Sequence, residues 1–169
     1  TGIWYPEDKI SNFELVESYN NYVRRFNNDN SKKIDSGDIV RMEESSVEFI
    51  EKASGIESRH VIDKDGILDI DRMMPKVVNE DHDKVSIHAQ AGIKAAIKAM
   101  SESDVTPEQI DAVIVGTSHS VRNYPAVAIE IQHELGITGY AYDMLVGCSS
   151  TTFAINNAYS DIASGLAKT

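Results

Sequence analysis

Two short apolar runs in the second half of the chain constrain its fold more than any other feature. Ala112–Gly116 is a short, continuously apolar run rich in β-branched residues, and Tyr140–Val146, which includes Asp143, is predicted to be a second buried strand. Such runs are typical of strands covered on both faces. Around them, residues 85–100, 125–136 and 149–166 repeat apolar side chains at helical spacing. Strands that alternate with helices in this way predict an α/β layer structure with a mainly parallel sheet.

The first half of the chain is more polar, and shorter elements are expected there. Thr1–Pro6 resembles the end of a strand that runs into a turn, and this start suggests an upstream part. Helices are predicted at Phe13–Phe26 and at Ser46–Ala53, the second ending at Gly55. The segment at about 27–44 opens on a polar tract and is expected to be a surface loop or an insertion.

Residues Asp63–Asp83 mix charged side chains with Met73 and Met74 and show no clear period, so an irregular loop is expected. Adjacent methionines are usually gap-fillers in a core. Side chains that line an acyl channel are the alternative interpretation.

Composition excludes several classes of function. The formal charge is −11 and no basic stripe is present, which argues against a nucleic-acid partner. No apolar run is long enough to cross a bilayer, and the first residues lack a secretory pattern. The single cysteine fits a reducing compartment. These features predict a cytoplasmic protein without a membrane partner.

That cysteine, Cys148, lies where the second strand gives way to a helix, in the sequence DMLVGCSSTT. Ligands of α/β sheets bind beyond the carboxyl ends of strands. The first turn of a helix has unpaired N–H groups and a partial positive charge, which favour a thiolate. Gly147 leaves room beside the sulfur and tolerates a sharp turn. The residue types therefore suit a nucleophile, although a small buried hydrophobe is the alternative. We interpret the four following hydroxyl residues mainly as capping of the helix.

Other kinds of site find little support. No Cys/His pair has the spacing of a metal site, and no phosphate-binding glycine loop occurs, so no metal and no permanently bound cofactor are expected. Among the histidines, His119 alone follows a predicted strand and is expected near the carboxyl edge of the sheet. The others are expected on the surface or in solvent: His60, His82, His88 and His133.

Nearly the whole chain resembles the N-terminal half of a β-ketoacyl-ACP synthase III, a thiolase-like condensing enzyme. Four stretches carry the resemblance, in the family's order and spacing: TGIWYPEDKISNFEL, SVEFIEKASGIESRHV, VTPEQIDAVIVGTSHSVRNYPAVAIEIQHELGI and GYAYDMLVGCSSTTFAINNAYSDIASGLAKT. The last of these is similar to the family segment that carries the nucleophilic cysteine. The resemblance implies a thiolase-like fold with a mixed, mainly parallel sheet, of which residues 1–169 are one half of a duplicated whole.

The resemblance also implies an activity for the complete protein. Cys148 would take a primer acyl group from acyl-CoA or acyl-ACP, and malonyl-ACP would then decarboxylate and condense with it. Asp143 matches an aspartate of the preceding strand, where a structural role is expected. That strand would lie at a homodimer interface, and the acyl carrier protein and a C-terminal half of the fold would be partners. The family's catalytic histidine and asparagine belong to that other half, so residues 1–169 alone are expected to be inactive.

The chain departs from the family pattern at four positions. Phe49 replaces a tryptophan and Ala53 an arginine, and the resemblance implies that both contact the adenine end of coenzyme A. Gly147 and Ser150 replace an alanine and a glycine around the nucleophile. An acyl transferase or a specialised synthase of the same fold is therefore a second hypothesis. A non-catalytic binding module with a buried Cys148 is a third.

Overall fold

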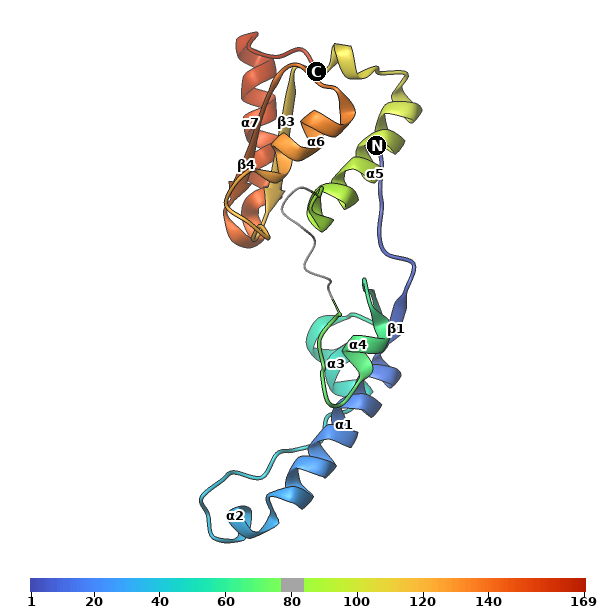
Figure 1. Cartoon of the computed structure of the whole chain (residues 1–169), viewed down its shortest axis with the longest axis vertical. Helices are drawn as coiled ribbons and strands as arrows, with labels where there is room; N and C mark the ends of the chain where they lie inside the picture. Colours follow the sequence, from blue (N-terminus) through green and yellow to red (C-terminus); the bar gives the residue numbers. More distant parts are fainter. Residues whose placement is uncertain (77–83) are drawn as a thin grey trace. The chain divides into compact units, whose positions relative to one another are not determined.

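The computed structural model describes residues 1–76 and 84–169, which divide into two compact units. The N-terminal unit is Tyr5–Asn79, and the C-terminal unit combines Thr1–Trp4 with Glu80–Thr169. Figure 1 labels most of their helices and strands. In the N-terminal unit these are β1 (Lys9–Ser11), α1 (Asn12–Asp29), α2 (Ser31–Asp35), α3 (Val47–Ser54), β2 (Ser58–His60) and α4 (Lys64–Leu68). In the C-terminal unit they are α5 (Ile87–Ser103), the 3-10 turn η1 (Pro107–Gln109), β3 (Ala112–Thr117), α6 (Val127–Leu135), β4 (Tyr140–Leu145), the 3-10 turn η2 (Gly147–Ser149) and α7 (Ser150–Ser164).

The C-terminal unit is built on the parallel pair β3–β4, in a register that places Ala112 opposite Tyr140 and Thr117 opposite Leu145. Helix α6 packs on one face of the pair and α7 on the other (Figure 1). Val113 packs toward the buried cluster formed by α5 and α6, which is made of Ala89, Val127 and Ile131. The predicted α/β layering and parallel strands are therefore confirmed.

The outer face of α7 differs from the expectation of a buried helical face. Ile155 and Tyr159 of α7, and Leu166 just beyond its end, follow helical spacing, yet these residues are 66%, 71% and 65% exposed. Between β3 and α7 lies a shallow hollow of about 380 Å³. No described residue covers this face. The periodicity of the sequence therefore predicted the position of the helix correctly but not the burial of its apolar face.

The N-terminal unit pairs β1 with β2 in antiparallel orientation, and α1 follows β1 directly. Helix α1 begins with a capping box in which Ser11 Oγ accepts from the Glu14 N–H and Glu14 accepts from the Ser11 N–H. Helix α3 begins after Ser46, whose side chain caps Phe49 N–H, and ends at Gly55, which has φ of 69°. The predicted helices of this half are confirmed.

The polar tract after residue 26 is helical, so the prediction of a loop from about residue 27 is wrong for residues up to Asp35. Helix α1 continues to Asp29 and α2 follows at once. Asn27 is buried, and its side chain pairs with both backbone groups of Met42, donating to the carbonyl at 2.9 Å and accepting from the N–H at 3.0 Å. A polar side chain can thus be buried when it makes hydrogen bonds with the backbone of an extended segment.

Three further expectations need correction. Thr1–Pro6 forms no strand; instead Lys94 Nζ of α5 lies 4.6 Å from the centre of the Trp4 ring. The predicted loop at 63–83 contains α4, because the Asp63 side chain caps its first turn, while residues 77–83 lie outside the described residues. The two methionines are exposed rather than core gap-fillers, Met73 by 38% and Met74 by 56%.

Candidate active site

Cys148 lies in the middle of η2, between the end of β4 and the start of α7, and is exposed. The predicted strand-to-helix junction is confirmed, and the alternative of a buried thiol is wrong for this chain. Gly147 has φ of 57°, a conformation that residues with a Cβ rarely adopt. The turn therefore presents the thiol beyond the carboxyl end of β4, at the positive end of the 15-residue α7 dipole.

The hydroxyl residues around this turn do not cap α7 in the way that the sequence suggested. Ser149 occupies the N-cap position, and no side-chain capping bond forms there. Instead the buried Ser150 Oγ accepts a hydrogen bond of 2.7 Å from the N–H of Val146, before the turn. The interpretation of these residues as ordinary capping is therefore wrong, because Ser150 bonds backward across the turn.

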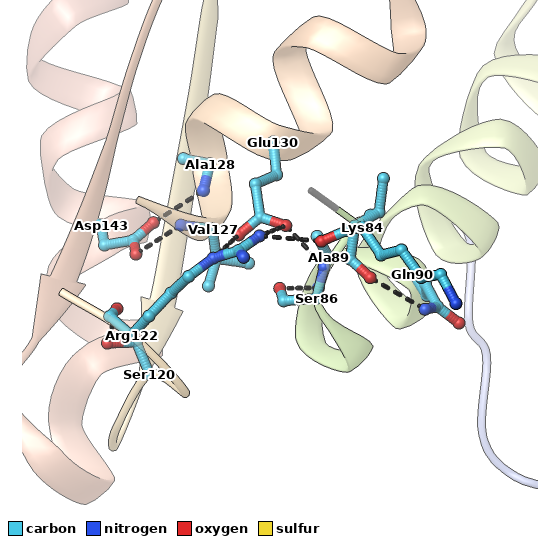
Figure 2. A network of polar contacts seen from close by, with 11 residues as sticks. Lys84, Ser86, Ala89, Gln90, Ser120, Arg122, Val127, Ala128, Glu130 and Asp143 are labelled. Atoms are coloured by element: carbon cyan, nitrogen blue, oxygen red, sulfur yellow. Dashed lines mark hydrogen bonds and ion pairs between the residues drawn. The ribbon is translucent and has the colours of Figure 1, made fainter. Parts of the chain in front are cut away.

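Asp143, on β4, binds the start of α6 (Figure 2). Its two carboxylate oxygens accept hydrogen bonds of 2.8 Å from the N–H groups of Val127 and Ala128. This explains why α6 begins at Val127 rather than at Pro125, the predicted first residue. The contacts agree with a structural role for Asp143, which satisfies unpaired donors at the positive end of the helix.

A buried ion pair that sequence reasoning missed joins α6 to the loop after β3 (Figure 2). The Glu130 side chain is 5% exposed, and Arg122 Nη2 lies 2.9 Å from its Oε2. Glu130 also accepts from the Ser86 N–H at 2.6 Å, and Arg122 donates to the Lys84 carbonyl at 3.0 Å. A charged residue one turn from Val127, on the apolar side of a helix, was the signal available in the sequence.

His119, predicted near the carboxyl edge of the sheet, lies two residues beyond β3 and is exposed. Its ring meets that of His88 edge-on, with ring centres 5.1 Å apart. His88 was expected in solvent, and this is wrong, because it is half-buried and its Nδ1 has no hydrogen-bond partner among the described residues. Burial, with a smaller contribution from His119, lowers the pKa of His88.

His60 is exposed in the N-terminal unit, with Nδ1 2.8 Å from the Pro6 carbonyl, and His133 is exposed on α6. His82 lies outside the described residues. Within residues 1–76 and 84–169 no cluster of three or more His, Cys, Asp or Glu side chains could hold a metal ion. No helix in the same part of the chain is long and apolar enough to span a membrane.

Phe49 belongs to the N-terminal unit, where its side chain on α3 is 67% exposed. It lines a groove of about 720 Å³ together with Met73 and residues of α1. Glu43 and Glu44 lie on the same groove, and Glu44 pairs with Arg24 at 2.6 Å. The groove thus offers an aromatic face beside carboxylates, and Ala53 adds no positive charge to it.

The chain is 44% identical over 153 residues to a β-ketodecanoyl-[acyl-carrier-protein] synthase of Pseudomonas aeruginosa, a match that covers 90% of this chain and 44% of that protein. It is 36% identical over 126 residues to a β-ketoacyl-[acyl-carrier-protein] synthase III of Brucella anthropi, covering 74% of this chain and 33% of the relative. The chain belongs to the β-ketoacyl-ACP synthase III family. It spans less than half the length of these relatives.

Solved structures agree with this membership of the β-ketoacyl-ACP synthase III family at the level of fold. The synthase III of Aquifex aeolicus superposes with a TM-score of 0.62 at 23% identity, over 97% of this chain and 39% of that one. The priming β-ketosynthase of the R1128 polyketide pathway gives 0.64 at 21% identity, over 95% and 35%. No family model matches the chain. The chain therefore has part of the thiolase-like fold of these enzymes.

Proposed function

We propose that Cys148 is the acyl acceptor of a decarboxylating condensing enzyme. The observation that carries this is the 44% identity to a β-ketodecanoyl-ACP synthase in a chain whose single cysteine is exposed in a strand-to-helix turn. The thiolate attacks the carbonyl of a primer thioester, and the primer's carrier leaves as a thiol. Malonyl-ACP then loses CO₂, and its carbanion attacks the acyl-Cys148 carbonyl, which releases the thiolate and β-ketoacyl-ACP. Covalent capture divides one difficult step into two.

The rest of the machinery is proposed in the same way. The N–H of Cys148 would stabilise the developing oxyanion. A histidine and an asparagine outside this chain would promote decarboxylation, and His119 would contact the substrate from the loop after β3. Because β4 pairs only with β3 among the described residues, its other edge is available for the proposed homodimer. A cytoplasmic location and fatty acid or related biosynthesis complete the proposal.

The name of the Pseudomonas aeruginosa relative suggests a primer. A β-ketodecanoyl product has ten carbons, and condensation with malonyl-ACP followed by loss of CO₂ adds two. We therefore propose an eight-carbon primer. The complete protein should be mixed with octanoyl and acetyl donors, each on coenzyme A and on ACP, and its intact mass measured. One added octanoyl group that disappears in Cys148→Ala supports the proposal. No acyl adduct from any donor would contradict it.

The second candidate is an acyl transferase or specialised synthase that does not take its primer from coenzyme A. The groove at Phe49 favours this, because Glu43 and Glu44 line it and its described lining contains no lysine or arginine to bind a phosphate. Labelling by octanoyl-ACP alone would select this candidate, whereas equal labelling by octanoyl-CoA would exclude it. A non-catalytic module is the outcome if Cys148 of the complete protein also resists iodoacetamide and cerulenin.

A further inference from the structure

The buried hydroxyl of Ser150 sits at the junction of the two strands and the Cys148 turn. Its oxygen accepts from the Val146 N–H at 2.7 Å, and lies 2.8 Å from the Thr117 carbonyl and 2.9 Å from the Gly147 carbonyl. A hydroxyl has one proton, so it donates to one carbonyl at a time or shares the proton between both. Ser150 is 2% exposed, and water does not compete for these bonds. Ser150, which follows the Cys148 turn, is thus tied to the start of that turn and to the end of β3.

This arrangement depends on Gly116, the neighbour of Thr117 on β3. A Cβ at Gly116 would lie 2.8 Å from the carbonyl carbon and oxygen of Ser150, and 3.0 Å from the N of Thr151. Distances this short to backbone atoms would force the start of α7 away from β3. The absence of a side chain at Gly116 therefore lets α7 approach closely enough for Ser150 Oγ to reach Thr117. The two residues act together.

We propose that Ser150, supported by Gly116, is a positioning residue for Cys148. Gly147 gives the turn a backbone conformation of its own, with φ of 57°, but the exposed turn needs an anchor to hold the thiol in one place. Ser150, two residues after the thiol, supplies that anchor through buried bonds to Val146 and Gly147, which precede the thiol, and to Thr117 of β3. Reaction rates fall steeply when a reacting group is displaced by about 1 Å. This inference rests on the proposed function of Cys148.

The test uses the complete protein and four variants: Ser150→Ala, Gly116→Ala, the double variant that combines them, and the matched control Thr152→Ala, which changes an exposed residue of the same helix. Single-turnover acylation by octanoyl-CoA or octanoyl-ACP, followed by intact mass, gives both a rate constant and a final labelled fraction. Hydrogen exchange of peptides that contain Val146 reports the anchor independently of any acyl chemistry.

Ser150→Ala and Gly116→Ala should each slow acylation about tenfold at saturating donor, with full final labelling and faster exchange at Val146. The double variant should be no slower than either single, since both remove the same contact. Thr152→Ala should match the wild type. A purely structural role would lower the labelled fraction and leave the rate constant unchanged, which would overturn the proposal.

Three other outcomes also decide between the possibilities. If exchange at Val146 does not change in Ser150→Ala, the hydroxyl is not the anchor and the proposal is wrong. If exchange rises while acylation stays as fast as in the wild type, Ser150 does not position the thiol, and the proposed role of Cys148 as acyl acceptor still stands. If the wild type takes up no acyl group, the proposed function fails, and the positioning role falls with it.

Discussion

Among the described histidines, His88 lies in surroundings that disfavour its protonated, charged form. Burial and His119 lower its pKa below the ordinary value of 6.5, although Asp143 and Glu130 act in the opposite direction. Arg122, paired with Glu130, adds a positive charge to the same region. The unfolded chain therefore binds more protons than the folded chain below about pH 6.5, and this difference removes stability as the pH falls through the folded pKa.

Replacing His88 by Gln should flatten the dependence of stability on pH. Between pH 7.5 and 5, the urea midpoint of the wild type should fall more than that of His88→Gln, because the variant has no buried imidazole to charge. His133→Gln, which changes an exposed histidine on α6, is the matched control and should follow the wild type. Parallel curves for His88→Gln and the wild type would show that His88 does not contribute.

Glu130 and Arg122 form the buried charge pair of the described C-terminal unit, with side chains 5% and 16% exposed. Glu130→Gln keeps an acceptor for Ser86 but removes the buried negative charge that lies 2.9 Å from Arg122 Nη2. Breaking a buried pair from one side costs about 3 kcal/mol or more. Urea unfolding should show a loss of this order, whereas Glu134→Gln, at an exposed position of the same helix, should change stability by less than about 0.5 kcal/mol. An equal, small effect for both variants would contradict the expectation.

At the level of single residues, sequence reasoning found Cys148 but not its supports. A lone cysteine between an apolar run and a helix is visible in the sequence, because the pattern is local. The bond from Ser150 to Thr117 joins residues 33 positions apart, and its formation depends on close packing at Gly116. Glu130 likewise binds Ser86 across 44 positions. Such contacts follow from tertiary packing, which periodicity does not encode.

Among the elements, α1 owes its unusual polar side to hydrogen bonds with an extended segment. Asn20 and Asn27 are seven residues apart, and both are buried. The Asn20 side chain donates to the Ser45 carbonyl at 3.0 Å and accepts from its N–H at 2.8 Å, as Asn27 does with Met42. The two amides thus hold the extended segment against α1 in place of a neighbouring strand.

Asn27→Ala should release this segment locally. The Met42 N–H and carbonyl would lose their hydrogen-bond partner. Leaving such groups unsatisfied lowers the free energy of unfolding by about 1–3 kcal/mol. Hydrogen exchange should rise in peptides that span residues 40–46 and should stay unchanged at β3 and β4. Asn28→Ala, at the exposed next position, serves as the control. Equal exchange at residues 40–46 in both variants would show that the amide of Asn27 does not hold the segment.

The elements that the sequence predicts well have local signals that mark where they begin and end. Helix α3 has a serine cap and a terminal glycine, and β3 contains the β-branched run Val113–Val115. The elements that it missed are α2 and α4, each of 5 residues, and β1 and β2, each of 3. These are too short for a period to be counted, and long-range contacts decide them, such as the pairing of Ile10 with Arg59.

For the whole chain, the exposed apolar face of α7 is expected to cause self-association in solution. Ile155 and Tyr159 of α7 are each more than 60% exposed, and Ile155 lines the hollow that α7 forms with β3. Contiguous exposed apolar side chains of this kind promote association. Residues 1–169 expressed by themselves should therefore self-associate at micromolar concentration, as measured by sedimentation velocity.

Changing this face should shift that equilibrium without unfolding the chain. Ile155→Ser combined with Tyr159→Ser removes two exposed apolar side chains, so little folded-state packing is lost and the monomer should predominate. Asn156→Ser, an exposed polar position of the same helix, should associate like the unchanged chain. Circular dichroism establishes that each variant keeps its helices. If the double variant sediments like the unchanged chain, association arises elsewhere, and the outer face of α7 is not what draws the copies together.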